Sequence, residues 1–184
     1  MNYELELTKI IKSDDVFMSI LKSVQALKLN DCWVAAGVIR NKVWDYLHNL
    51  QTEINDIDVI YFDKSDCSTE TEKFLESKLQ HIMPAQPWSV KNQARMHIKN
   101  KVSPYLSSFD GVAHFPETPT SIAVRLNNEK IEIMAPYGLS DLFEGLVRPT
   151  PPFSRNANLH TIYLNRIQNK NWHSIWNKLV IESE

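Results

Sequence analysis

Apolar residues return at helical spacing through the first thirty positions of the chain. This periodicity predicts helix between Tyr3 and about Leu29, because every third or fourth side chain falls on one helix face. Ser13-Asp14-Asp15 interrupts the pattern and supplies an N-cap for a second helix. We expect the apolar stripe to pack against the rest of the domain and to bind no cofactor.

Strand-like and helical patterns then alternate. Cys32–Gly37 is a short apolar run that ends in glycine, which is typical of a buried strand followed by a tight turn. Asp56–Asp63 alternates apolar and polar residues, which is typical of a half-buried strand. Helical periodicity covers Val38–Leu50 between these strands and Thr69–His81 after them. This order predicts strands that pack against helices.

Two further patterns complete the second half of the chain. Ser121–Leu126 and Lys130–Ala135 are strand-like runs joined by Asn127-Asn128-Glu129, and this combination predicts a hairpin. Asn158–Leu179 has helical periodicity with an expected break near Asn169–Asn171. The last helix completes the core together with the helices at the N-terminus.

The elements as a whole predict an α/β (α+β) fold with a small mixed β-sheet flanked by helices, including N-terminal and C-terminal helices. The 184 residues suit a single domain, 1–184. Within it we distinguish the N-terminal helices of residues 1–30, a core of residues 31–150 that holds the candidate catalytic residues, and a C-terminal helical segment of residues 151–184.

Composition narrows the class of protein. Hydrophobic residues make up 43% and charged residues 23%, which suits a soluble globular core. The formal net charge of -2 gives no overall basic field, so a nucleic-acid partner is unsupported by net charge and would need a local basic patch. Cys32 and Cys67 stand alone and predict free thiols. No apolar run approaches the length of a membrane span, so we expect no membrane partner and a cytoplasmic protein.

Asp56 and Asp58 are the first candidates for chemistry. Side chains two apart on a strand share a face, so the two carboxylates would stand side by side. Like charges repel, and burial raises the free energy of each further; a divalent cation relieves both costs. The alternative is an exposed strand start at which one Asp caps a turn and the other is solvated.

Two other segments offer groups that bind anions. The strand that ends at Gly37 is followed by a helix, and the free N–H groups of a helix start can receive a phosphate. A plain turn is the alternative there. Trp88–His97 is rich in donors. The side chains that could gather around an anionic substrate, or form a solvated surface, are Lys91, Asn92, Arg95 and His97.

Glu132 is a third candidate acid. It stands between Ile131 and Ile133 in the second arm of the expected hairpin, so its side chain points to the opposite face from theirs. The ordinary explanation is a carboxylate on the solvated side of an edge strand.

Other catalytic motifs are missing from the sequence. It contains no Gly-x-x-x-x-Gly-Lys phosphate loop and no Gly-x-Ser-x-Gly elbow. The six histidines are scattered without the spacing of zinc ligands.

The combination of segments resembles a known family. A strand ending in glycine, a helix, Asp-x-Asp on the next strand and a later strand acid are similar to the DNA polymerase beta nucleotidyltransferase superfamily. More closely, the chain resembles an uncharacterised bacterial nucleotidyltransferase-like family, a former domain of unknown function, from about Leu29 to Leu179. The blocks that carry this resemblance are Gly37–Asn41 with Val43–Asp45, Asp56–Asp63, Trp88–His97, Phe115–Thr118 and Ile131–Leu142.

The resemblance implies roles for individual residues. It makes Asp56, Asp58 and Glu132 the metal ligands and catalytic carboxylates, with the strand of Glu132 beside that of the aspartates. Gly37 occupies the first half of the superfamily's Gly-Gly or Gly-Ser turn, and Val38 replaces the second small residue.

Five residues are expected to bind the nucleotide or the second substrate. They are Gly37, Arg40, Asn41, Lys91 and Arg95. Arg40 and Asn41 would contact the triphosphate from the first helical turn. Lys91 and Arg95 would neutralise phosphate charge or bind the acceptor.

The function implied is a metal-dependent nucleotidyltransferase, with Mg²⁺ or Mn²⁺ as cofactor. It would move a nucleoside monophosphate from a nucleoside triphosphate to an unknown hydroxyl acceptor. One alternative is a non-catalytic module that binds nucleotide, RNA or protein; another is hydrolysis, with water as acceptor. The transferase hypothesis in this form requires the three acids to converge.

Overall fold

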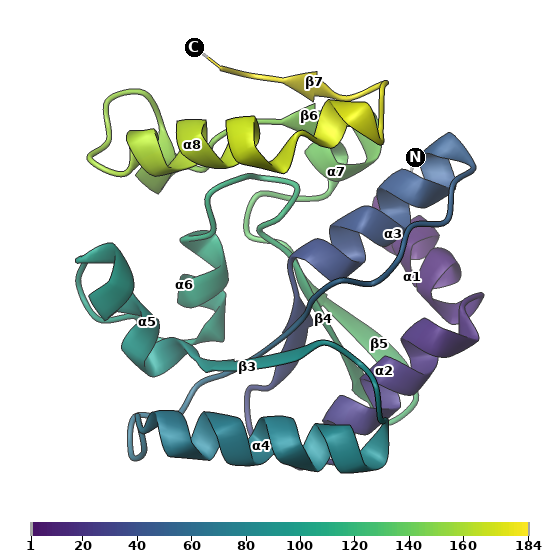
Figure 1. Ribbon diagram of the computed structural model, residues 1–184, viewed down its shortest axis with the longest axis vertical. Coiled ribbons are helices and arrows are strands. Elements are labelled where there is room, and N and C mark those ends of the chain that lie inside the picture. The colour runs from purple at the N-terminus through teal and green to yellow at the C-terminus, as the bar shows by residue number, and fades with distance from the viewer. Residues whose placement is uncertain (1, 184) are drawn as a thin grey trace.

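A five-stranded mixed sheet lies at the centre of the computed structural model, which describes residues 2–183 (Figure 1). The strand order is β3-β2-β1-β4-β5. β2 and β3 run parallel, and the other neighbours run antiparallel. The strands are β1 (Trp33–Ala35), β2 (Ile57–Tyr61), β3 (Trp88–Asn92), β4 (Ala123–Asn127) and β5 (Lys130–Met134). The mixed sheet with flanking helices confirms the predicted fold class.

Helices cover the sheet on both faces. They are α1 (Tyr3–Lys12), α2 (Asp15–Gln25), α3 (Gly37–His48), α4 (Thr69–Ile82), α5 (Gln93–Asn100), α6 (Ser108–Ala113), α7 (Ser140–Glu144) and α8 (His160–Lys170). In Figure 1, α5 and α6 lie on one side of the sheet, and α1 and α2 lie on the other. Within residues 2–183, no helix combines the length and the apolar character needed to cross a membrane.

Alternation along the strands divides the apolar residues between two cores. Ile57, Val59 and Val34 belong to the larger core, which includes α1, α2 and α4. Ile60 and Ala35 face the other way and belong to a smaller core with Val112 of α6. Because Asp58 lies between Ile57 and Val59, it points to the side of the smaller core.

Local capping explains two boundaries predicted from sequence. The side chain of Asp14 accepts a hydrogen bond from the backbone N–H of Phe17 at 2.9 Å, so α2 begins where the first helix was expected to break. Asn128 and Glu129 both have positive φ, 45° and 64°, which closes the two-residue turn between β4 and β5. The predicted hairpin is confirmed.

The C-terminal segment differs from its prediction. α8 ends at Lys170 because Asn171 adopts a left-handed conformation with φ 43°, at the expected break. From there to residue 183 the chain forms no further α-helix. A 3-10 turn at Trp172–Ser174 follows, and β7 (Val180–Ile181) then pairs in parallel with β6 (Leu146–Val147). The pairing ties the end of the described chain to the segment that follows α7.

Candidate active site

The junction between β1 and α3 has an unusual backbone. Ala36 has φ 59° and ψ −121°, a conformation that glycine adopts far more readily than alanine. Its N–H donates to the carbonyl of Ile122 at 2.9 Å, which fixes the turn. The position that demands glycine-like freedom is therefore Ala36, one residue before Gly37, which already has helical backbone. No side chain caps α3, and Ala36, Gly37 and Val38 all line a cavity.

Asp56 and Asp58 lie at the start of β2, on the same side of the chain. Asp58 pairs with Ala35 across the sheet, and Asp56 precedes the strand by one residue. Burial, and after it the neighbouring charge of Asp56, raise the pKa of Asp58 to about 6, against the lowering effect of Lys91, Arg166 and Lys170. Burial also raises the pKa of Asp56, while Lys170 and Lys91 lower it. The two carboxylates thus stand close together with an unmet demand for positive charge.

A cavity of about 890 Å³ opens beside these carboxylates. Such a volume is within the range of small-molecule sites. It is lined by five residues that the sequence nominated: Gly37, Arg40, Asn41, Asp56 and Asp58. The structure therefore brings together two separate parts of the chain: the first turn of α3, with Gly37, Arg40 and Asn41, and the aspartate pair at the start of β2.

Arg40 is held rigidly in the cavity wall. Its side chain is buried between two indole rings, with the guanidinium carbon 5.0 Å from the centroid of Trp44 and 4.6 Å from that of Trp172. It donates to the hydroxyl of Thr120 at 2.9 Å and to the amide oxygen of Asn41 at 2.8 Å. Burial lowers its pKa to about 10, so it remains a cation at neutral pH.

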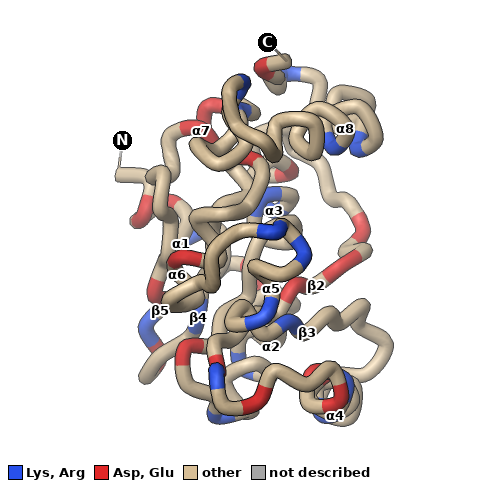
Figure 2. Tube along the Cα trace, turned by 90° about the vertical axis from the view of Figure 1, so that its left-hand side faces the viewer, with Lys and Arg blue, Asp and Glu red and all other residues tan. Residues whose placement is uncertain are grey.

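The C-terminal helix contributes basic residues that sequence reasoning missed. Arg166 and Lys170 of α8 both line the cavity. In Figure 2 the basic positions of α8 lie above the acidic positions at the start of β2. The two residues are four apart and so share a helix face. This spacing is the signal that could have found them, whereas the helical periodicity of Asn158–Leu179 indicated only that the segment packs into the core.

Glu132 does not join the aspartates. Its strand β5 is separated from β2 by β1 and β4, so the expectation of adjacent strands is wrong. At about 4.8 Å per strand spacing, three spacings place its backbone roughly 14 Å away from β2. Its carboxylate instead accepts from Arg125 Nε at 2.6 Å and from the amide of Asn127 at 2.8 Å. The hairpin turn fixes this local partnership, because it brings Arg125 directly opposite Glu132.

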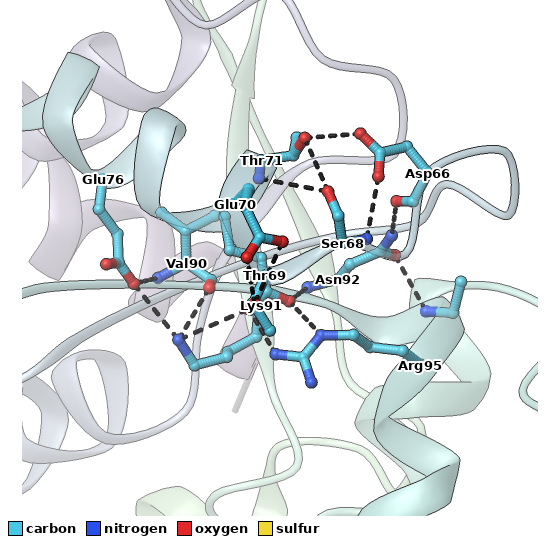
Figure 3. Close-up of polar contacts among 12 residues, drawn as sticks. Asp66, Ser68, Thr69, Glu70, Thr71, Glu76, Val90, Lys91, Asn92 and Arg95 are labelled. Atoms are coloured by element: carbon cyan, nitrogen blue, oxygen red, sulfur yellow. Dashed lines mark hydrogen bonds and ion pairs between the residues drawn. The ribbon is translucent and has the colours of Figure 1, made fainter.

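Lys91 and Arg95 also lie outside the cavity lining. Lys91 Nζ is 3.3 Å from Glu76 Oε1, and Arg95 Nε donates to Glu72 Oε1 at 2.7 Å. Figure 3 shows Lys91 directed toward Glu76. Both basic residues are thus engaged by acids of α4, and the expectation that they gather around a substrate is not met. Lys91 remains close enough to lower the pKa of Asp58.

The carboxylates fit a divalent cation that also binds a substrate. Within residues 2–183, no three His, Cys, Asp or Glu side chains are gathered into a metal-binding group. Magnesium often uses only one or two carboxylates and completes its shell with water and substrate phosphate. The exposed Asp56 and the half-buried Asp58 beside cationic side chains match that donor set better than they match an all-protein metal cage.

Two comparisons with known proteins point to the same kind of protein. A family model described as "Nucleotidyltransferase" matches residues 22–181. A solved structure described as a CCA-adding enzyme head domain is 36% identical, with a TM-score of 0.86, and the match covers 98% of this chain and 96% of that one. None of the curated proteins matches.

Longer solved structures share the fold at low identity. A CCA-adding enzyme in an apo form is 11% identical with a TM-score of 0.62, and a CCA-adding enzyme in complex with ATP is 14% identical with a TM-score of 0.57. Each match covers 96% of this chain but 42% of the other. The present chain thus spans less than half the length of these two enzymes.

Proposed function

The chain belongs to a nucleotidyltransferase family, and on that premise we propose that it transfers a nucleoside monophosphate from a nucleoside triphosphate to a hydroxyl acceptor, with Mg²⁺ or Mn²⁺ bound at Asp56 and Asp58. The observation that carries this proposal is the shared lining of one cavity. Asp56 and Asp58 face a helix start and the cations Arg40, Arg166 and Lys170 across about 890 Å³.

The charge around the cavity suits a metal–triphosphate complex. A nucleoside triphosphate brings several negative charges, and the lining supplies four cationic side chains, Arg40, Lys42, Arg166 and Lys170, of which Lys42 is paired with Asp14. The free N–H groups at the start of α3 add a further site of positive potential. Guanidinium groups form paired hydrogen bonds with phosphate oxygens, so two arginines can fix the orientation of the chain of phosphates.

The reaction would be a displacement at the α-phosphorus. The acceptor oxygen forms a bond to this atom while the bond to the β-phosphate breaks and pyrophosphate leaves. A divalent cation, when bound, offsets the charge that develops on the phosphate oxygens and lowers the pKa of the acceptor hydroxyl. Asp56 and Asp58 orient the cation, and the cationic wall holds the leaving pyrophosphate in place.

The acceptor is a hydroxyl compound of unspecified class. The similar solved structures include CCA-adding enzymes, and one of them is a complex with ATP. These names support a nucleoside triphosphate as donor. For the acceptor they make the hydroxyl end of an RNA one candidate among proteins and small metabolites, because the fold hosts more than one acceptor chemistry.

The proposal is tested by product analysis. The purified chain is incubated with each labelled triphosphate, Mg²⁺ or Mn²⁺ and a cell extract, with and without ribonuclease, and pyrophosphate release is followed. Asp58→Asn serves as the inactive variant and Glu132→Gln as a matched carboxylate control. We expect a labelled acceptor and pyrophosphate with the wild type and with the control, and neither product with Asp58→Asn.

A non-catalytic nucleotide-binding module is the second candidate. The observation in its favour is that Glu132 lies with Arg125 on the far strands of the sheet, which leaves the aspartate pair without a third acid within residues 2–183. Nucleotide binding without pyrophosphate release, over long incubation with the extract, would support the module. Release of free nucleoside monophosphate would instead show hydrolysis.

A further inference from the structure

Glu117 is a fully buried carboxylate directly behind the cavity wall. Its exposed fraction is 0%, and Thr120, Ser121 and Ile122 of the same loop between α6 and β4 are buried as well. The loop is fixed by backbone hydrogen bonds, since the N–H of Thr118 donates to the backbone carbonyl of Arg148 at 2.9 Å and the N–H of Ser121 donates to the backbone carbonyl of Glu117 at 2.9 Å. A buried carboxylate is costly unless it is paired, so its partner identifies its role.

That partner is Arg166 of α8. Arg166 Nε donates to one carboxylate oxygen of Glu117 at 2.6 Å, and Nη2 donates to the other at 3.3 Å. A guanidinium has five N–H donors, and these two bonds occupy a single edge of it. The Arg166 side chain is 35% exposed and lines the cavity. Its remaining N–H donors are therefore part of a side chain that borders the cavity.

Glu117 also acts on Arg40. Burial lowers the pKa of Arg40, the Glu117 carboxylate raises it, and the Arg166 guanidinium lowers it. One carboxylate therefore lies within electrostatic range of two guanidinium groups from helices at opposite ends of the chain. The carboxylate reduces the repulsion between the two guanidinium groups. The three groups together still carry one net positive charge, which suits an anion-binding site.

We propose that Arg166 and Arg40 form a phosphate-binding pair for the polyphosphate part of the substrate, and that Glu117 is the positioning residue that holds Arg166 in place. The inference rests on the proposed nucleotide site and assigns its anion-binding end. Glu117 touches no substrate; it sets the direction of the Arg166 guanidinium, and Thr120 does the same for Arg40 through a 2.9 Å hydrogen bond.

A second pair in the chain provides the matched control. Asp141 is buried, and Arg148 Nε donates to Asp141 Oδ2 at 3.0 Å, so this pair also joins an arginine to a buried carboxylate. Neither residue is among those that line the cavity. If Glu117–Arg166 were only a structural tie between a loop and a helix, its loss would resemble the loss of Asp141–Arg148.

The experiment measures binding of inorganic tripolyphosphate with Mg²⁺, and in parallel of ATP with Mg²⁺, by calorimetry. Thermal unfolding is recorded for each variant. We expect Arg166→Ala and Glu117→Gln each to weaken tripolyphosphate binding by about 10- to 100-fold, the range for loss of a charged hydrogen bond. In the double variant, Glu117→Gln should add less than about two-fold, because it acts through Arg166. Asp141→Asn should lower the unfolding temperature and leave tripolyphosphate affinity unchanged.

Several outcomes would overturn the inference. These are wild-type affinity in Arg166→Ala, a full additional loss from Glu117→Gln in the Arg166→Ala background, or no tripolyphosphate binding by the wild type. If Glu117→Gln does not fold, Arg166→Lys provides the test, since it keeps the charge but loses the paired geometry and should bind about 10-fold more weakly. Tripolyphosphate binding without nucleotide transfer would remove the proposed transferase and leave the phosphate pair standing.

Discussion

Arg125 and Glu132 face each other across the β4–β5 ladder, with Arg125 Nε 2.6 Å from Glu132 Oε2. The Arg125 guanidinium also lies 4.2 Å from the ring centroid of the buried Trp33, so the ion pair is part of a small cluster on β1, β4 and β5. Glu132 thus has its partner at the opposite edge of the sheet from β3, with β1 and β4 between it and Asp58.

The first prediction concerns which acids the reaction needs. We expect Glu132→Gln to retain nucleotide transfer within about two-fold and to cost less than about 1 kcal/mol of stability, as for an exposed ion pair. Asp58→Asn should reduce the rate by more than about 100-fold, because even partners of metal ligands cost 10- to 100-fold. Initial rates at saturating Mg²⁺ measure both. An equal loss of transfer rate in the two variants would show that the reaction needs Glu132 as well.

The second prediction concerns the stability of the metal-free protein. Because burial raises the folded-state pKa of Asp58 to about 6, the fold favours the protonated acid. The ionised group therefore destabilises the fold, by an amount that is absent below about pH 4, grows between about pH 4 and 6, and is complete above it. Asp58→Asn removes the charge, and above pH 6 it should raise the free energy of unfolding by about 3 kcal/mol.

Denaturant titrations in the presence of a chelator check this pH profile. The difference between Asp58→Asn and the wild type should disappear near pH 4, where both side chains are neutral. The groups that act on the Asp58 carboxylate are Asp56, Lys91, Arg166 and Lys170. A variant that is less stable than the wild type at pH 8 would contradict the prediction and would show that these cations outweigh burial.

The third prediction concerns the turn before α3. Ala36 holds φ 59° and ψ −121° at a cost that glycine would not bear. After allowance for the greater freedom of glycine in the unfolded chain, Ala36→Gly should stabilise the protein by about 1 kcal/mol. Gly37→Ala is the control, because an added Cβ would have only Arg40 Nη2 at 3.7 Å as a near neighbour. Thermal unfolding of both variants measures the effect, and a lower midpoint for Ala36→Gly would argue against strain.

The fourth prediction concerns Glu72 of α4. Its Oε1 accepts from the backbone N–H of Asn92 at 2.8 Å and from Arg95 Nε at 2.7 Å, in a buried position. Glu72→Ala leaves both donors without their acceptor and should destabilise the fold by about 3 kcal/mol. Because neither Glu72 nor Arg95 lines the cavity, nucleotide affinity of the folded fraction should stay unchanged. Urea unfolding and calorimetry test the two halves separately.

Local patterns predicted the elements well. The cap at Asp14 and the turn at Asn128-Glu129 are each specified by a few neighbouring residues, and both appear in the structure as expected. The same holds for Asp56 and Asp58, because alternation on one strand is enough to place two side chains on one side. These features depend on the backbone geometry of a short segment, which sequence determines directly.

Long-range relationships were less accessible. The order of strands decided the position of Glu132, and nothing in its own neighbourhood reveals that β1 and β4 intervene. Arg166 meets Glu117 across 49 residues of sequence, from a helix whose polar face resembles any solvated face. Lys91 and Arg95 looked available because their partners on α4 lie about 15 to 23 positions earlier. Such pairings follow from packing rather than from local pattern.

The acids of α4 have a further consequence at the outer edge of β3. Glu76 accepts from the backbone N–H of Val90 at 2.8 Å, as Glu72 does from Asn92, so the helix occupies donors that an incoming strand would otherwise meet. Unprotected strand edges template aggregation between copies. The outer edge of β3 is thereby protected, and the other edge of the five-stranded sheet is β5, where Lys130 and Glu132 present charge.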